Sequence, residues 1–543
     1  MEHFGIWGII PPVLTIILAL VTKDVIISLF LGVFSGVLIV AGGNPLVALI
    51  NATDLLAESL NDGWNIRIFL FCAMLGGLVG LLSKTGAAVA LGHWTATKIK
   101  GRKSSLLTAW FLGLIVFIDD YFNSLAVGTI MRPITDKQRI SRAKLSYILD
   151  STAAPVCILA PVSSWVVTVM SVVKASDGFT HLGISEFEFF LRSIPYNIYA
   201  ILTLLMVVVL SVTYRDFGPM KESERLAMEK NILFNEELYG AAGGDVPAET
   251  NPRAKAVDMI LPIVVLIISA VFFFPFTTWM RAIDGEKIYS VSEAMASMSL
   301  STAFVETDAS VALFYASIFT VVFTYIYFIA RRLLNLHTAS AALKDGIASM
   351  VPALIILTMA WTIGTVIRAT PDEGGLGLAK YLAQIVTEGH FPFWLLPAVM
   401  FIVSALIGFS TGSSWGTFTI MIPITIPIAI ALAEIHGLQM SSLLNATMIS
   451  VAAVLSGAVF GDHASPISDT TILSSTGAGC PHLEHVTTQL PYATFVSACA
   501  FVGFLVGGIT LNPLIGWVAT LIVFTIGMIF LPNILSGKLK VKK

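Results

Sequence analysis

The sequence has few charged residues: Asp, Glu, Lys and Arg make up only 12% of its 543 residues, whereas 56% are hydrophobic. Soluble domains carry about 25% charged residues, so this composition is typical of a polytopic membrane protein. The net charge is only −3, and the sequence has no basic stripe with interleaved aromatic residues. Nucleic acid is therefore excluded as a partner.

Cysteine and catalytic motifs are also scarce. The chain has four cysteines, without CxxC or zinc-ligand spacing, at Cys72, Cys157, Cys480 and Cys499. Neither a disulfide framework nor a metal knot is implied. HExxH is absent, which disfavours an intramembrane hydrolase that pairs His463 with Asp462. We expect a chain that is not an enzyme and needs no cofactor.

Long apolar runs account for most of the chain. Taking about 20 residues as the length needed to span a bilayer core, we find runs at 6–21, 25–41, 68–83, 106–130, 145–173, 195–212, 257–276, 311–330, 350–367, 393–432, 443–475, 490–511 and 514–531. The N-terminus lacks a basic region and a cleavage site, so the first run is expected to remain as a helix. The sequence predicts an all-α polytopic membrane protein with about twelve transmembrane helices.

Basic residues predict the orientation. Lysines and arginines flank run 106–130 on both sides, so this run is expected to enter and return from the cytoplasm as a re-entrant hairpin. Run 393–432 has acidic flanks and is expected to form a second hairpin of opposite orientation. The connection 215–255 and the tail after 531 are basic, which predicts a cytoplasmic C-terminus.

Short matches between the two halves support an inverted repeat. MRPIT at 131–135 resembles MIPIT at 421–425, and APVSS at 160–164 resembles SPISD at 465–469. Inverted repeats with discontinuous helices are typical of secondary transporters. We therefore expect an N-terminal repeat at 1–214, a cytoplasmic linker at 215–255, an inverted C-terminal repeat at 256–511, and a final helix with a basic tail at 512–543.

Polar breaks interrupt four of the apolar runs, two in each half. Unwound backbone at membrane depth is tolerated only where protein buries it or where it lines a cavity, so the breaks are expected to meet near the midplane. Their candidate transport and ion-binding residues are Asp119, Asp120, Asn123, Ser124, Asp150, Ser151, Thr152, Ser410, Thr411, Ser413, Ser414, Thr417, Asp462, His463, Ser465, Ser468 and Asp469.

The breaks hold five carboxylates and no Lys or Arg other than Arg132 at one exit, so they are expected to select cations. Several buried acids cannot all ionise at once, which lets Na⁺ and H⁺ compete for them. A dicarboxylate carrier would be expected to supply arginine. Our proposed Na⁺ ligands are Asp119, Asn123, Ser413, Asp462 and Asp469, with alternating access produced by movement of one half relative to the other.

Other roles remain open for these residues. Asp462 and Asp469 could cap half-helices, and Asp150 could pair with Lys144. His463 could bond to a carbonyl group instead of handling protons. The serines and threonines could join membrane helices to one another.

Three motifs carry a family resemblance: DDYFNSLAVGT at 119–129, STGSSWGT at 410–417 and GDHASPISDTTILSSTGA at 461–478. With them the chain resembles the NhaC-type sodium/proton antiporters of the ion transporter superfamily. The resemblance implies Na⁺/H⁺ exchange by a multi-pass protein in the lipid bilayer of a bacterial inner membrane. It leaves open a Na⁺-coupled or H⁺-coupled carrier of an amino acid or small organic acid, and it leaves open a homodimer.

Overall fold

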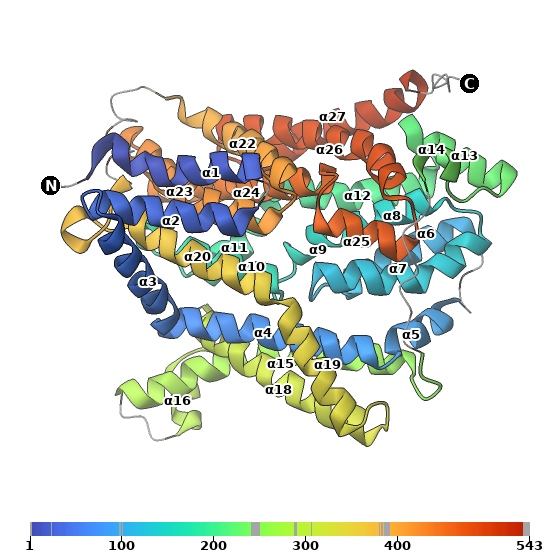
Figure 1. The fold of residues 1–543 in the computed structure, drawn as a ribbon, viewed down its shortest axis with the longest axis horizontal. Coiled ribbons are helices and arrows are strands. Elements are labelled where there is room, and N and C mark those ends of the chain that lie inside the picture. The colour runs from blue at the N-terminus through green and yellow to red at the C-terminus, as the bar shows by residue number, and fades with distance from the viewer. Residues whose placement is uncertain are drawn as a thin grey trace.

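The computed structural model describes residues 3–22, 24–96, 99, 101–240, 250–286, 290–305, 307–378, 381, 384 and 391–535. Within these ranges every regular element is a helix (Figure 1), which confirms the predicted all-α class. Ten helical segments in the described chain are long and apolar enough to cross a membrane: Gly63–Lys84, Ile198–Lys230, Ala256–Ile283, Ala309–Ala330, Leu336–Ile367, Phe393–Thr411, Ser414–Ile435, Met440–Ala464, His482–Thr510 and Pro513–Ile534. The inverted repeat and the residue boundaries of its parts stay predictions.

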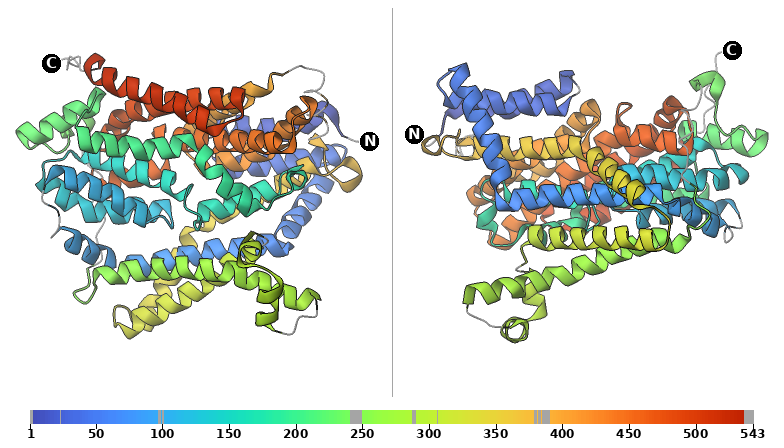
Figure 2. Two further views of the ribbon diagram at one scale, coloured as in Figure 1. Left: turned by 180° about the vertical axis from the view of Figure 1, so that it is seen from behind. Right: turned by 60° about the horizontal axis from the view of Figure 1, so that its bottom comes forward.

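The helices form two bodies that do not follow the halves of the chain. The smaller body consists of α4 (Gly63–Lys84), α15 (Ala256–Glu286), α18 (Ala309–Ala330) and α19 (Leu336–Ser349), which pack on one another. It lies along the lower edge of Figure 1, and both further views keep α15 and α18 at the outside of the molecule (Figure 2). Its first helix thus comes from the first half and the other three from the second.

The larger body holds the four interrupted runs. Its central helices are α6 (Arg102–Ile115), α7 (Asp120–Lys137), α8 (Arg142–Thr152), α9 (Ala154–Cys157), α10 (Ser164–Lys174), α12 (Ile198–Thr213), α22 (Leu396–Thr411), α23 (Ser414–Ile435), α24 (Met440–Ala464), α25 (Asp469–Ala478), α26 (His482–Thr510) and α27 (Pro513–Ile534). The breaks fall between α6 and α7, between α8 and α10, between α22 and α23, and between α24 and α25. All four predicted interruptions are therefore present.

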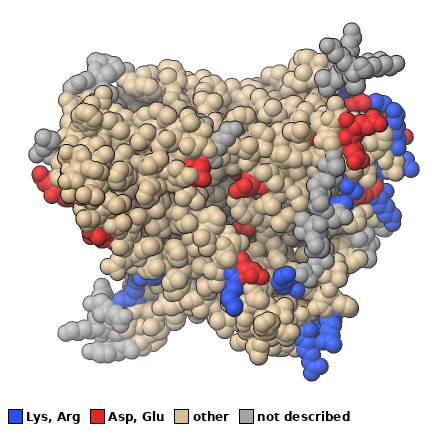
Figure 3. Space-filling view, in the orientation of Figure 1, with Lys and Arg blue, Asp and Glu red and all other residues tan. Residues whose placement is uncertain are grey.

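The remaining helices cover the edges. They are α1 (Ile10–Thr22), α2 (Val25–Val40), α3 (Pro45–Asn61), α5 (Ala87–Ala96), α11 (Glu186–Ser193), α13 (Gly218–Lys230), α14 (Glu236–Tyr239), α16 (Val291–Ser297), α17 (Leu300–Val305) and α20 (Val351–Arg368). Charged side chains gather at one end of the molecule, beside α13, whereas most of the face in Figure 3 is uncharged. A broad uncharged face is what a lipid-exposed surface requires.

The segment 277–310 lies between two predicted apolar runs and is mildly acidic, so the sequence predicts a long connection there. In the structure, α15 instead continues to Glu286, and α16 and α17 follow. The cause is local. Thr278 and Thr307 lie with their hydroxyl oxygens 2.9 Å apart, and Thr307 donates to the carbonyl of Phe274 over 2.7 Å, which folds the segment back on α15. The basic tail residues Lys538, Lys540, Lys542 and Lys543 lie outside the described residues.

Glycines hold α4 against α19. A Cβ atom on Gly80 would lie 2.1 Å from the carbonyl oxygen of Ala342, and one on Gly346 would lie 2.1 Å from that of Gly76. No side chain fits at this crossing, so the two backbones are in direct contact. The MLGGLVG segment is thus a packing element.

Helix α13 ties the two halves of the larger body together. The buried carboxylate of Glu224 pairs with the guanidinium of Arg102 and accepts a hydrogen bond of 2.8 Å from the backbone N–H of Ser141. The neighbouring Ser223 donates over 2.8 Å to Glu484 of α26. One short helix therefore holds α6 and the start of α8 from the first half, and α26 from the second.

A second buried ion pair lies just before this helix. Lys144, which is 1% exposed, pairs with Asp216, and Tyr492 also donates to Asp216 over 2.6 Å. Lys144 is therefore not the partner of Asp150 that the sequence left open as an alternative. The pair again joins α8 to α26.

We predict that Glu224→Gln lowers the stability of the protein by about 3 kcal/mol, because it removes one partner of a buried ion pair. The guanidinium of Arg102 is only 15% exposed and would lose its counter-charge. The measurement is thermal unfolding in detergent. Glu222→Gln on the same helix is the matched control, because Glu222 is 49% exposed and pairs with the surface residue Arg225. Equal shifts for both variants would contradict the prediction.

Candidate functional site

Each interrupted run restarts at a polar N-cap. The caps are Asp119 for α7, Ser163 for α10, Ser413 for α23 and Ser468 for α25, each accepting a hydrogen bond from the backbone N–H three residues ahead. Two carboxylates follow in the first turns, Asp120 in α7 and Asp469 in α25. The positive end of a helix dipole stabilises a negative side chain there. The helix dipoles therefore offset part of the cost of an ionised carboxylate at these two helix starts.

Asn123 closes the break between α6 and α7. Its Nδ2 donates to three carbonyl oxygens, those of Gly113 at 2.7 Å, Val116 at 2.9 Å and Thr152 at 2.9 Å. The ends of α6 and α8 are thereby held on one side chain. Its Oδ1 is buried and has no hydrogen-bond partner among the described residues, so the amide ties the helix ends together and also offers an acceptor.

Asp120 is a buried carboxylate with an unpaired oxygen. The residue is 2% exposed, and its Oδ2 has no hydrogen-bond partner among the described residues. It lies beside the indole of Trp165, which packs edge to face on Trp415 with ring centroids 5.6 Å apart. The buried hydroxyl of Ser164, next to this indole, also lacks a partner. An ion or a water is one partner that can satisfy a buried oxygen of this kind.

Asp462 lies in a box of hydroxyl groups. Its Oδ1 accepts from Ser468 at 2.5 Å and its Oδ2 accepts from Ser414 at 2.8 Å. Ser468 belongs to the break before α25, and Ser414 begins α23. The carboxylate of α24 thus joins both interrupted runs of the second half, and all its side-chain partners are neutral oxygens.

Asp150 connects the first half to the second. Its Oδ2 accepts from Gln489 at 2.6 Å and from Thr471 at 3.0 Å. Two imidazoles lie nearby, with the Nε2 atoms of His485 and His463 at 3.8 and 4.0 Å from the same oxygen. All five residues are buried, so Asp150 is enclosed by groups that can carry or donate protons.

Gln489 holds this cluster in place. Its Nε2 also donates to the backbone oxygen of His463 over 2.6 Å, and its Oε1 lies 2.8 Å from Nε2 of His485. The other ring nitrogen of His463, Nδ1, lies 2.8 Å from the hydroxyl of Tyr199. Thus the amide of Gln489 closes the break after α24 much as Asn123 closes the break after α6.

The interrupted helices also touch through glycine. A Cβ atom on Gly128 of α7 would lie 2.6 Å from the carbonyl carbon of Gly477 in α25, and one on Gly477 would lie 2.5 Å from the carbonyl oxygen of Ser124. Beside this contact the hydroxyls of Ser474 and Ser124 are 3.1 Å apart. The predicted residue Ser124 thus lies at the joint between the two halves.

The other predicted residues have more local surroundings. Thr152, Thr411 and Thr417 donate to carbonyls of their own helices, as serines and threonines often do in membrane helices. Ser465 accepts from the backbone N–H of Ile467, and Ser151 lies 3.4 Å from His463. Ser410 is half-buried.

Asp469 differs from the other carboxylates because its side chain is exposed. Its Oδ2 accepts from the hydroxyl of Tyr121 over 3.4 Å. It therefore lies at the rim of the buried carboxylates.

Sequence reasoning missed Gln489, His485 and Tyr199. His485 and Gln489 are four residues apart, so they share one face of α26, but they precede the apolar run that begins at residue 490. Two polar residues at helical spacing before an apolar run were the available signal. Tyr199 lies within an apolar run and offered none.

Among the described residues, the partners found for the buried carboxylates of the breaks, Asp119, Asp150 and Asp462, are hydroxyl, amide, backbone N–H and imidazole groups, with no lysine or arginine among them. No group of three His, Cys, Asp or Glu residues suited to a metal ion occurs in this part of the chain. The site therefore offers single carboxylates surrounded by neutral oxygens, which suits a monovalent hard cation or a proton.

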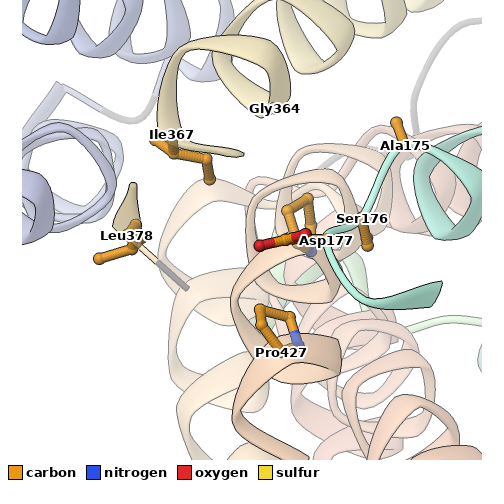
Figure 4. Close-up of a pocket in the computed structure, with 8 residues that line it drawn as sticks. Ala175, Ser176, Asp177, Gly364, Ile367, Leu378 and Pro427 are labelled. Atoms are coloured by element: carbon orange, nitrogen blue, oxygen red, sulfur yellow. The ribbon is translucent and has the colours of Figure 1, made fainter. Parts of the chain in front are cut away.

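One pocket outside the breaks is too small to serve as a site. Ser176, Asp177, Gly364, Ile367 and Pro427 line it between α10, α20 and α23 (Figure 4), and its volume is about 10 Å³. That is room for about one water molecule. Asp177 points into this pocket and is separate from the carboxylates of the breaks.

Comparisons with known proteins indicate the family of this chain. The model of the Na⁺/H⁺ antiporter family matches residues 156–509. An uncharacterized protein of Haemophilus influenzae is 37% identical over 95% of this chain and 93% of its own length. The malate-2H⁺/Na⁺-lactate antiporter of Bacillus subtilis is 33% identical over 31% of this chain and 33% of its own. Among solved structures, the YdaH transporter of Alcanivorax borkumensis covers 89% of this chain and 90% of its own at 14% identity, with a TM-score of 0.47.

We predict that Gln489→Ala destabilises the protein by about 1 to 3 kcal/mol, because the carbonyl of His463 and the carboxylate of Asp150 lose a buried donor. Thermal unfolding in detergent measures the change. Thr488→Val is the matched control, since the hydroxyl of Thr488 bonds only within α26, to the carbonyls of Glu484 and His485. If the control is as unstable as Gln489→Ala, the tie between α24 and α26 is not what Gln489 supplies.

Proposed function

Because the chain belongs to the Na⁺/H⁺ antiporter family, we propose that it exchanges Na⁺ for H⁺ at the buried carboxylates of its interrupted helices. Membership in this family makes it a multi-pass membrane transporter. Beyond family membership, we assign the residues that bind the exchanged cations and the movement that opens them to each side of the membrane.

The observation that carries the proposal is the unpaired Oδ2 of Asp120. A buried ionised carboxylate is expensive unless a cation neutralises it, and no lysine or arginine is among its described partners. Either Na⁺ or H⁺ removes that cost. A carboxylate that must always be neutralised, by either Na⁺ or H⁺, can exchange one cation for the other.

The surroundings support different preferences among the carboxylates. The free oxygens of Asp120 and Asn123, one helical turn apart in α7, and the hydroxyl box of Asp462 offer oxygen ligands for Na⁺. Asp150 instead adjoins His463 and His485, whose ring nitrogens can donate or accept a proton. We assign Na⁺ to the first group and H⁺ transfer to the second. Two of the Na⁺ ligands predicted from sequence have other positions. Ser413 is the N-cap of α23, and Asp469 lies at the rim of the buried carboxylates.

The contacts of α13 bear on how the site is exposed. Because Glu224 and Ser223 join elements from both halves of the chain within the larger body, we treat the larger body as one unit. We propose that alternating access comes from a shift of this body against α4, α15, α18 and α19; the half-against-half movement expected from the sequence stays a prediction.

The test uses purified protein in sealed liposomes with an imposed Na⁺ gradient and a trapped pH dye. We expect Na⁺-dependent proton movement by the parent protein. Asp462→Asn keeps the shape and removes the charge, so we expect a loss of about 2 kcal/mol in Na⁺ binding, or roughly thirtyfold in half-saturating Na⁺. Asp120→Asn should behave in the same way.

Asp177→Asn is the control of equal chemistry. It should leave the exchange unchanged, because Asp177 borders a pocket for about one water. An Asp462→Asn, Asp120→Asn double variant that exchanges at the parent rate would refute the assignment. The parent's half-saturating Na⁺ concentration should also rise as the pH falls, because protons compete for the same carboxylates.

A second candidate is a carrier that couples Na⁺ or H⁺ to an organic solute. The named Bacillus subtilis relative favours it, because its name includes malate and lactate. A folded parent protein that moves no protons in the liposome assay would select this candidate. The next measurement is Na⁺-driven uptake of labelled amino acids and hydroxy acids.

A further inference from the structure

A cavity of about 590 Å³ separates α7 from the crossing of α4 and α19. Glycine, alanine, valine and leucine make up much of its wall, and its charged lining residues are Lys84, Asp119 and Asp345. Lys84 and Gly86 extend its lining to the end of α4 and the start of α5, two helices that lie in the lower part of Figure 1. The cavity thus lies between the two bodies of the molecule.

Helix α7 has one face on this cavity and another on the buried site. Tyr121, Leu125 and Thr129 line the cavity at helical spacing. Asn123 and Ser124 point the other way, to the breaks and to α25. A single helix, α7, therefore separates the cavity from the buried site. The two regions come together at the N-terminus of α7.

Asp119 occupies that end. It lines the cavity, caps α7 through the N–H of Phe122 at 2.9 Å and directly precedes the unpaired Asp120. Beside it, Tyr121 lines the cavity and donates to Asp469. This part of the cavity lining is thus adjacent in sequence to the buried carboxylate of Asp120.

We propose that this cavity is the aqueous vestibule for small monovalent cations, and that Asp119 is the residue that receives the ion before Asp120. This rests on the proposed function, because it names the route to the same site. Asp119 acts as a positioning and selecting residue: its charge raises the local concentration of cations at the start of α7.

The dimensions fit this role. The cavity volume of about 590 Å³ holds on the order of 20 waters. That is enough for a Na⁺ ion with its hydration shell. The aliphatic wall cannot replace that hydration shell, so the first exchange of water for protein oxygen occurs at a polar group. Asp119 is the acidic lining residue next to the buried site.

The test is the reactivity of single cysteines placed on the cavity face of α7, Thr129→Cys and Leu125→Cys. Each is treated with a trimethylammonium-ethyl and a sulfonatoethyl methanethiosulfonate, and each rate is divided by that of the same reagent with free cysteine. We expect the cationic reagent to be favoured about tenfold, and Na⁺ to slow it. The four native cysteines are free and buried, and the parent protein gives their background rate.

Two controls separate the vestibule from general exposure. Val127→Cys lies on the opposite face of α7 and is fully buried in the parent, so it should not react. Adding Asp119→Asn retains the N-cap, since asparagine caps as well as aspartate, but removes the charge. The preference for the cationic reagent should then fall to near one. Two results would overturn the proposal. One is equal relative rates of the two reagents with the cysteine variants that retain Asp119, and the other is a reactive Val127→Cys.

Failure of this proposal can be told from failure of the proposed function, because reactivity is measured without any gradient. In liposomes, modification of Thr129→Cys should also stop Na⁺-dependent proton movement. Exchange that survives complete modification would overturn the vestibule and leave the exchange function intact. Absence of exchange in the parent, with charge-selective reactivity retained, would overturn the exchange function alone.

Discussion

The structure depends on one constraint: backbone groups freed by a helix break at membrane depth must find partners within the protein. Two amide side chains meet this demand. Asn123 takes three carbonyls with one nitrogen, and Gln489 takes the carbonyl of His463 while bonding to Asp150. Since amides are neutral, they satisfy the backbone without supplying positive charge. The carboxylates between them stay available to mobile cations.

The same constraint explains how the site distinguishes charges. Helix N-termini attract anions, and four of them restart in the breaks. Each has a side-chain oxygen as its cap, and two carry a carboxylate in the next position. The positive ends of these helices are therefore occupied by the protein's own acceptors. What remains for a solute is a set of oxygens, which favours cations.

The sequence was sufficient to predict the helical class, the four breaks and their carboxylates, because polar residues inside apolar runs are visible in one dimension. Partners brought from distant segments were not visible. Tyr199 looks like an ordinary residue of an apolar run, and the pairing of Lys144 with Asp216 depends on the packing of α8 against α26. Helix α3 was missed because its polar residues, among them Asp54 and Glu58, break the apolar run that the search required. The division into two bodies mixes both halves, so no boundary in the chain marks it.

The contact between Gly128 and Gly477 has a mechanical consequence. Where side chains separate two helices, rotamer changes absorb small displacements, but backbone in contact with backbone has no such slack. A shift of α7 is passed directly to α25, and with it from the neighbourhood of Asp120 to that of Asp469. If an ion binds beside α7, as we propose, a displacement that it causes there reaches α25 through backbone contact alone, without a ligand that bridges the two helices.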